Sequence, residues 1–138
     1  MPGVRAHHMH PVIHFQSRLF DIAKEPANPI NPIPGASLLE WLRAKLPSDM
    51  AMSPPAAEDW GWYADLRFAG RSYLVGSCAH ESADGNHEWV LQIDKSRSLT
   101  EKLFGQAKLD TDDPCFSLIH RLILQEPAFT DISVERGP

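Results

Sequence analysis

Alternating apolar and polar side chains in three consecutive segments constrain the fold of this chain more than any other feature. Apolar side chains occupy every second position of the first and third segments: Trp60, Trp62, Ala64 and Leu66, then Trp89, Leu91 and Ile93. Successive side chains of a strand point to opposite faces, so a period of two predicts strands with one buried face. With residues 73–80 between them, these segments predict an antiparallel three-stranded meander.

The turns between these segments set the predicted register. Asp84-Gly85 resembles a two-residue hairpin loop and pairs Cys78 with Leu91. A two-residue turn at 69–70 then places Trp62 on the wrong face, so we predict a three-residue turn over 68–70. The predicted core face of the middle segment carries Leu74, Gly76, Cys78 and His80. The uncovered face, a candidate partner-binding surface, carries Tyr63, Tyr73, Val75 and Val90.

Capping signals predict the helices. The Ser-x-x-Glu spacing of a capping box begins at Ser37 and again at Ser98, and each is followed by apolar residues at helical spacing. Asp113 followed by Pro114 is typical of an N-cap and a first helical position. We expect helices over 37–46 and 114–126, with a shorter one over 98–104.

Two further alternating segments, 12–20 and 130–134, predict a first strand and a short closing strand, the second of them at an edge of the sheet. The predicted fold class is α+β: a two-layer sandwich of a mainly antiparallel sheet of about five strands, with two main helices on one face. The expected element order is β-α-β-β-β-α-α-β. We expect residues 11–138 to form a single domain and residues 1–10 to be a disordered leader, with Met1 and Met9 both open as the native start.

Composition excludes some classes of function. The net charge is -5 and the basic residues are scattered, so the chain lacks the positive surface that binds nucleic acid. No window approaches the ~20 apolar residues of a membrane span. The two distant cysteines favour free thiols in a reducing, cytoplasmic setting. Phosphate-loop, dinucleotide and zincin motifs are missing from the sequence, so no cofactor is expected.

One group of residues suggests a metal site. The predicted register places Cys78, His80 and His87 on one face at the end of a hairpin, and thiolate and imidazole are the ligands that zinc prefers. The alternative is a pair of solvent-facing histidines beside a thiol packed in the core. The spacing permits both interpretations, because no recurrent metal-ligand motif is present.

The Pro-rich segment contains two copies of one triplet: Asn28-Pro29-Ile30 and Asn31-Pro32-Ile33. Proline fixes its own φ, so this stretch is either a stiff recognition surface or simply a rigid connection. Our leading hypothesis is a non-enzymatic module that binds another protein or a second copy of itself, through this segment or the uncovered sheet face. The alternatives are a metal-binding protein, or a small metal-dependent enzyme, and a carrier with a ligand pocket between sheet and helices.

Overall fold

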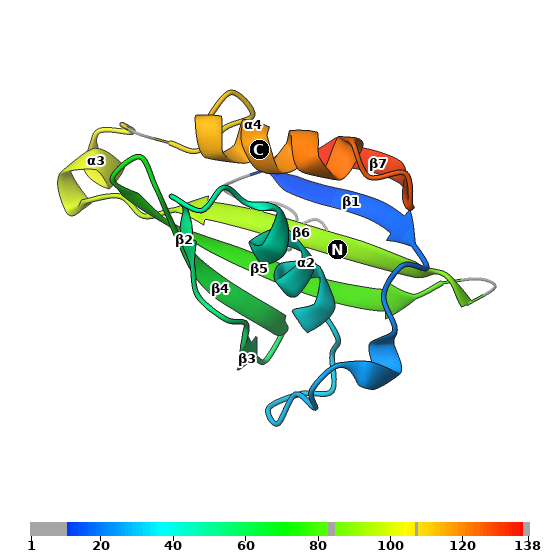
Figure 1. Ribbon diagram of the computed structural model, residues 1–138. Coiled ribbons are helices and arrows are strands. Elements are labelled where there is room, and N and C mark those ends of the chain that lie inside the picture. The colour runs from blue at the N-terminus through cyan, green and yellow to red at the C-terminus, as the bar shows by residue number, and fades with distance from the viewer. Residues whose placement is uncertain (1–10, 83–84, 107, 137–138) are drawn as a thin grey trace.

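The computed structural model describes residues 11–82, 85–106 and 108–136, and the expected leader over 1–10 lies outside them. A single antiparallel sheet runs through the molecule in the order β2-β4-β5-β6-β1-β7, with β3 also paired to β4 (Figure 1). The strands are β1 (Val12–Ser17), β2 (Ala51–Met52), β3 (Ala56–Glu58), β4 (Gly61–Phe68), β5 (Arg71–Glu81), β6 (His87–Lys95) and β7 (Phe129–Glu135). The α+β prediction is confirmed, and the short strands β2 and β3 raise the strand count to seven.

Helices α2 (Ala36–Lys45) and α4 (Pro114–Leu124) pack on the same face of this sheet (Figure 1). The 3-10 turn η1 (Ile22–Lys24) and the short helix α3 (Leu99–Leu103) lie at the periphery. Asp113 is the N-cap of α4, as predicted, and accepts hydrogen bonds from the Cys115 and Phe116 amides. Among the described residues, no helix is long and apolar enough to cross a membrane.

The two predicted capping boxes have different outcomes. Ser98 and Glu101 form a complete capping box at the start of α3. At α2 the N-cap is Gly35, and Ser37 makes no capping box with Glu40. The carboxylate of Glu25 takes that role instead, because the chain before α2 folds back and places it against the first turn.

The core lies between the sheet and the two helices. Its largest fully buried side chains include aromatic residues from β1, β6 and α4, together with aliphatic residues of α2: Phe15, Trp89, Phe116, Leu38, Leu39 and Leu42. Trp62, Leu66, Leu91 and Ile93 face this core, as the alternation predicts. The period-two pattern of β4 and β6 is therefore read correctly from the sequence.

The predicted register of β5 is wrong by one residue. Ser77, rather than Cys78, pairs with Leu91, and the hairpin loop covers 82–86 instead of 84–85, with Asp84 itself outside the described residues. Because a slip of one residue inverts every side chain, the core face of β5 carries Tyr73, Val75, Ser77 and Ala79. The outer face carries Leu74, Gly76, Cys78 and His80.

The β4–β5 turn follows from this register. Phe68 pairs with Arg71, so the turn is the two-residue Ala69-Gly70 loop, and the predicted three-residue turn is wrong. Both turn residues have positive φ, 52° and 77°, as a two-residue hairpin of this twist requires. The alternation assigns Trp60 to the buried face, but its ring lies against Gly76 on the outer face.

Gly35 provides a test of how closely α2 approaches the sheet. A Cβ atom at this position lies 2.3 Å from the backbone oxygen of Ser77. We therefore expect Gly35→Ala to lower the free energy of unfolding by about 1 to 3 kcal/mol, the usual effect of overpacking, measured by urea denaturation. Gly70→Asn is the control, because Gly70 has open space around it and Asn tolerates positive φ. Equal effects of the two substitutions would contradict the close approach.

Candidate functional site

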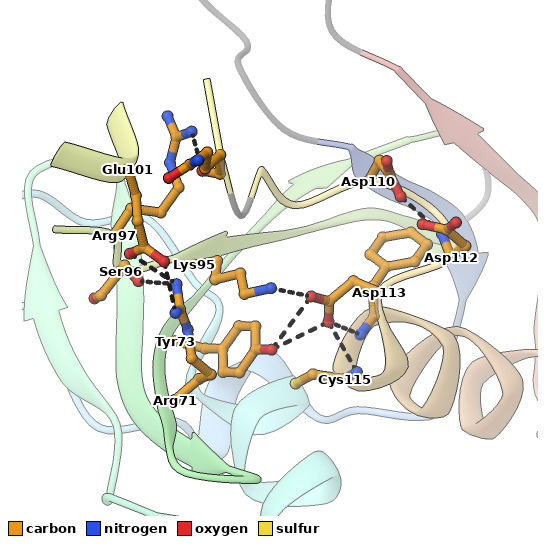
Figure 2. A network of polar contacts seen from close by, with 12 residues as sticks. Arg71, Tyr73, Lys95, Ser96, Arg97, Glu101, Asp110, Asp112, Asp113 and Cys115 are labelled. Atoms are coloured by element: carbon orange, nitrogen blue, oxygen red, sulfur yellow. Dashed lines mark hydrogen bonds and ion pairs between the residues drawn. The ribbon is translucent and has the colours of Figure 1, made fainter. Parts of the chain in front are cut away.

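A buried polar network joins the sheet to the start of α4 (Figure 2). The hydroxyl of Tyr73 lies 3.2 and 3.3 Å from the two carboxylate oxygens of Asp113, and Lys95 Nζ lies 2.9 Å from Oδ2. The amides of Cys115 and Phe116 donate to Oδ1 at 2.9 and 3.3 Å. Asp113 is only 5% exposed, so all of these interactions are shielded from water.

The interactions of this network stabilise the fold. Four donor groups surround the Asp113 carboxylate, which leaves it no free position from which to accept a substrate proton. Burial and the nearby Asp113 charge raise the pKa of Tyr73 well above its usual value. Burial, together with Asp113, raises the pKa of the Cys115 thiol to about 12. Both groups stay protonated at neutral pH, so neither is an activated nucleophile.

Two substitutions test this structural role. Asp113→Ala removes the α4 N-cap and leaves Lys95 without its buried partner, so we expect the free energy of unfolding to fall by about 3 kcal/mol or more. Tyr73→Phe removes one hydrogen bond and keeps the ring, with an expected loss of about 1 kcal/mol. Denaturant titration of both variants measures the difference. Similar losses in the two variants would contradict a central role for the carboxylate.

An ion pair attaches α3 to the beginning of β5. The guanidinium of Arg71 binds both carboxylate oxygens of Glu101, at 3.0 and 3.3 Å, and also donates to the backbone oxygen of Ser96 at 3.0 Å (Figure 2). The hydrogen bond from Arg71, with the Ser98 amide as second contributor, lowers the pKa of Glu101 to about 2. The bidentate geometry holds α3 in one orientation relative to the sheet.

The lowered pKa predicts how α3 responds to acid. A group whose folded pKa is depressed contributes its full stabilisation above its ordinary pKa, 4.5 here, and loses it as the pH falls through the folded value, about 2. We expect the amide NMR signals of Leu103 and Phe104 to shift between pH 4.5 and 2. Glu101→Gln should produce the same shift at pH 7. Signals that stay constant until global unfolding would refute the attachment.

The apolar side chains of α3 face solvent. Leu99, Leu103 and Phe104 are 82%, 74% and 69% exposed, and we call these three residues the α3 ridge. α3 lies beyond the end of the sheet, away from α2 and α4 (Figure 1). The sequence predicts the helix but not its exposure, because apolar residues at helical spacing are also the signal of a buried face. The helix has only five residues, and this short length is the one feature that favours exposure of its apolar side chains.

The predicted metal ligands do not come together. Cys78 and His80 share the outer face, with Sγ and Nε2 3.7 Å apart, whereas His87 pairs with Glu81 on the opposite face of the sheet. The one-residue register shift explains this separation. Across the part of the chain that the structure describes, no group of three His, Cys, Asp or Glu side chains has a metal-binding arrangement. Burial, assisted by Glu88, raises the pKa of the Cys78 thiol.

The structure places the four residues of the predicted partner surface on two different faces of the sheet. Tyr63 and Val90 lie half-buried on the outer face. Tyr73 and Val75 instead face the core, 3% and 0% exposed, because their strand has the opposite orientation to the one predicted. The outer face is consequently less aromatic than the sequence indicates, although Trp60 contributes a partly exposed ring over Gly76.

The asparagines of the two repeated triplets in the Pro-rich segment form hydrogen bonds with the turn between β3 and β4. The side-chain amide of Asn28 donates to the backbone oxygens of Glu58 and Gly61, at 3.1 and 2.9 Å. The amide of Asn31 donates to the oxygen of Asp59 at 2.9 Å. Both asparagines therefore hold the β3–β4 turn, which supports the interpretation as a rigid connection. Pro29 and Pro32 remain exposed.

Comparison of the chain with protein-family models, with curated protein sequences and with solved structures gave no significant match.

Proposed function

We propose that this protein is a non-enzymatic module that binds another protein through the α3 ridge. The observation that carries this proposal is the exposure of Leu99, Leu103 and Phe104 on a helix that is held firmly by Arg71 and Glu101. Large apolar side chains gathered on a rigid projection are typical of a protein-binding surface. Burying each of them fully would contribute about 1.5 to 3 kcal/mol.

The charges around the ridge indicate the chemistry of the partner. Arg97, Lys102 and Lys108 lie within four residues of the ridge in the chain, and Arg97 donates to the backbone oxygen of Gln106 at 3.0 Å. The one acidic group of α3, Glu101, is neutralised by Arg71. A partner that presents an apolar groove bordered by carboxylates complements this surface in shape and in charge.

The same charges disfavour a second copy of this chain as the occupant. A two-fold symmetric contact places identical patches against one another. Two ridges in contact would bring Lys102 and Lys108 of both copies together, and like charges oppose such an association. The proposal therefore commits to a different protein rather than to a homodimer.

The test begins with an affinity capture from native cell extract, followed by reconstitution of the complex from purified components. We expect an identified partner with an acidic binding face to form a 1:1 complex. The triple variant L99S/L103S/F104S should weaken this complex by about 100-fold or more, because the apolar contacts are lost. Leu124→Ser is the matched control, since Leu124 is 56% exposed but lies on α4. It should bind as the unchanged protein does.

The contribution of Lys102 and Lys108 to partner binding is measured separately, through the association rate and its dependence on salt. We expect K102E/K108E to slow association and to remove its acceleration at low salt, because the long-range attraction between the basic residues and an acidic partner is replaced by repulsion. Three results would overturn the proposal: a reconstituted partner that binds the triple variant unchanged, faster association of K102E/K108E, or failure of every captured protein to form a 1:1 complex. Self-association that the triple variant abolishes would replace the partner by a second copy.

A further inference from the structure

A cavity of about 550 Å³ opens to solvent beside the first turn of α2. Its apolar lining comes from separate segments of the chain and includes Leu19, Phe20, Ala36 and Trp62. This volume lies within the range of sites that bind small molecules, and such sites are also lined mainly by apolar and aromatic side chains.

The charged groups at the rim of the cavity already have partners. Asp21 Oδ2 lies 3.9 Å from Lys24 Nζ, and Asp21 Oδ1 accepts a hydrogen bond from the amide of Ala23 at 3.1 Å. Glu40 Oε1 lies 3.7 Å from Arg43 Nη1. An ionic ligand would have to compete with these partners or bring its own charge out of water unpaired, and both cost free energy.

The remaining polar side chains of the lining are engaged as well. The Glu25 carboxylate accepts hydrogen bonds from the amides of residues 35–37, at 2.9 to 3.2 Å, and from the Ser37 hydroxyl. The indole of Trp62 donates to the backbone oxygen of Ile33 at 3.1 Å. These hydrogen bonds fix the walls, so a ligand meets a preformed surface and the entropic cost of binding is lowered.

Two further features leave a polar ligand short of donors. Three of the lining residues are Pro26, Pro54 and Pro55, and proline has no amide N–H. The side chain of Lys24 is 84% exposed, so its ammonium group stays hydrated outside the cavity. A polar group that entered the cavity would therefore lose hydrogen bonds to water without replacing them.

From this arrangement we infer that the cavity binds a small, neutral and mainly apolar molecule, which packs against Leu19, Phe20 and Trp62. Binding is driven by the apolar surface that the ligand and these side chains remove from water. The inference goes beyond the proposed function, because it concerns a different site and a different class of ligand.

The test uses two probes that share one aromatic body and differ by a single charged group: neutral N-phenyl-1-naphthylamine and anionic 8-anilino-1-naphthalenesulfonate. Titration of the full chain is followed by NMR at the amides of Ala36 and Ser37. We expect the neutral probe to shift these signals saturably and the anionic probe to bind there at least about 10-fold more weakly. Equal affinities at these amides, or no saturable shift with the neutral probe, would contradict the inference.

Variants separate apolar packing from charge recognition. Leu19→Asn keeps the size of the side chain but makes it polar, and should weaken binding of N-phenyl-1-naphthylamine by about 5-fold. Leu124→Asn is the matched control: Leu124 is similarly exposed, 56% against 47% for Leu19, but lies on α4, so the affinity should not change. D21N/E40Q should also leave the affinity unchanged, because both carboxylates are already paired.

Two results from these variants would refute the site: an unaltered affinity in Leu19→Asn, or weaker binding of the neutral probe in D21N/E40Q. The L99S/L103S/F104S variant should give the same shifts at Ala36 and Ser37 as the unchanged protein. That control keeps the result independent of the partner proposal, because the α3 ridge is the other exposed apolar surface to which these probes could bind.

Discussion

The pairing of β5 with β6 is the constraint on which the rest of the structure depends. Ser77 lies opposite Leu91, and this register directs Tyr73, Val75 and Ala79 toward the helices. The Tyr73 hydroxyl can then form a hydrogen bond with Asp113 at the start of α4. Gly35, at the start of α2, can pack closely against the backbone oxygen of Ser77. Both helices are therefore positioned by one strand in the middle of the sheet.

The connection between β1 and α2 depends on the same strand. Ala79 donates its amide to the oxygen of Pro34 at 2.9 Å, and Asn28 and Asn31 fasten the preceding triplets to the β3–β4 turn. Glu25 then caps α2 from outside the helix. The Pro-rich stretch thus holds the start of α2 against the sheet.

The α3 ridge lies at one end of the sheet, whereas α2 lies over its middle (Figure 1). The α3 ridge is a projecting, apolar surface with basic neighbours, suited to a groove in another protein. The cavity beside the first turn of α2 is concave and largely apolar, and the carboxylates of Asp21 and Glu40 at its rim are ion-paired with Lys24 and Arg43. Three basic residues, Arg97, Lys102 and Lys108, lie close to the ridge in a chain whose net charge is -5. The buried network around Asp113 connects the sheet to the start of α4 and includes no residue of the ridge.

Local sequence signals were enough to predict the α+β class, the faces of β4 and β6, and the N-cap of α4, because alternation and capping involve residues close together in the chain. Only the tertiary structure decided which face of β5 is buried. A shift of one residue in the pairing of β5 with β6 turns every side chain of β5 to the opposite face. The same limit applies to Glu25, which caps α2 from ten residues before Gly35, and to the α3 ridge. The apolar side chains of a helix are buried only if the helix packs on the sheet. A local sequence pattern predicts the helix but not its position relative to the end of the sheet.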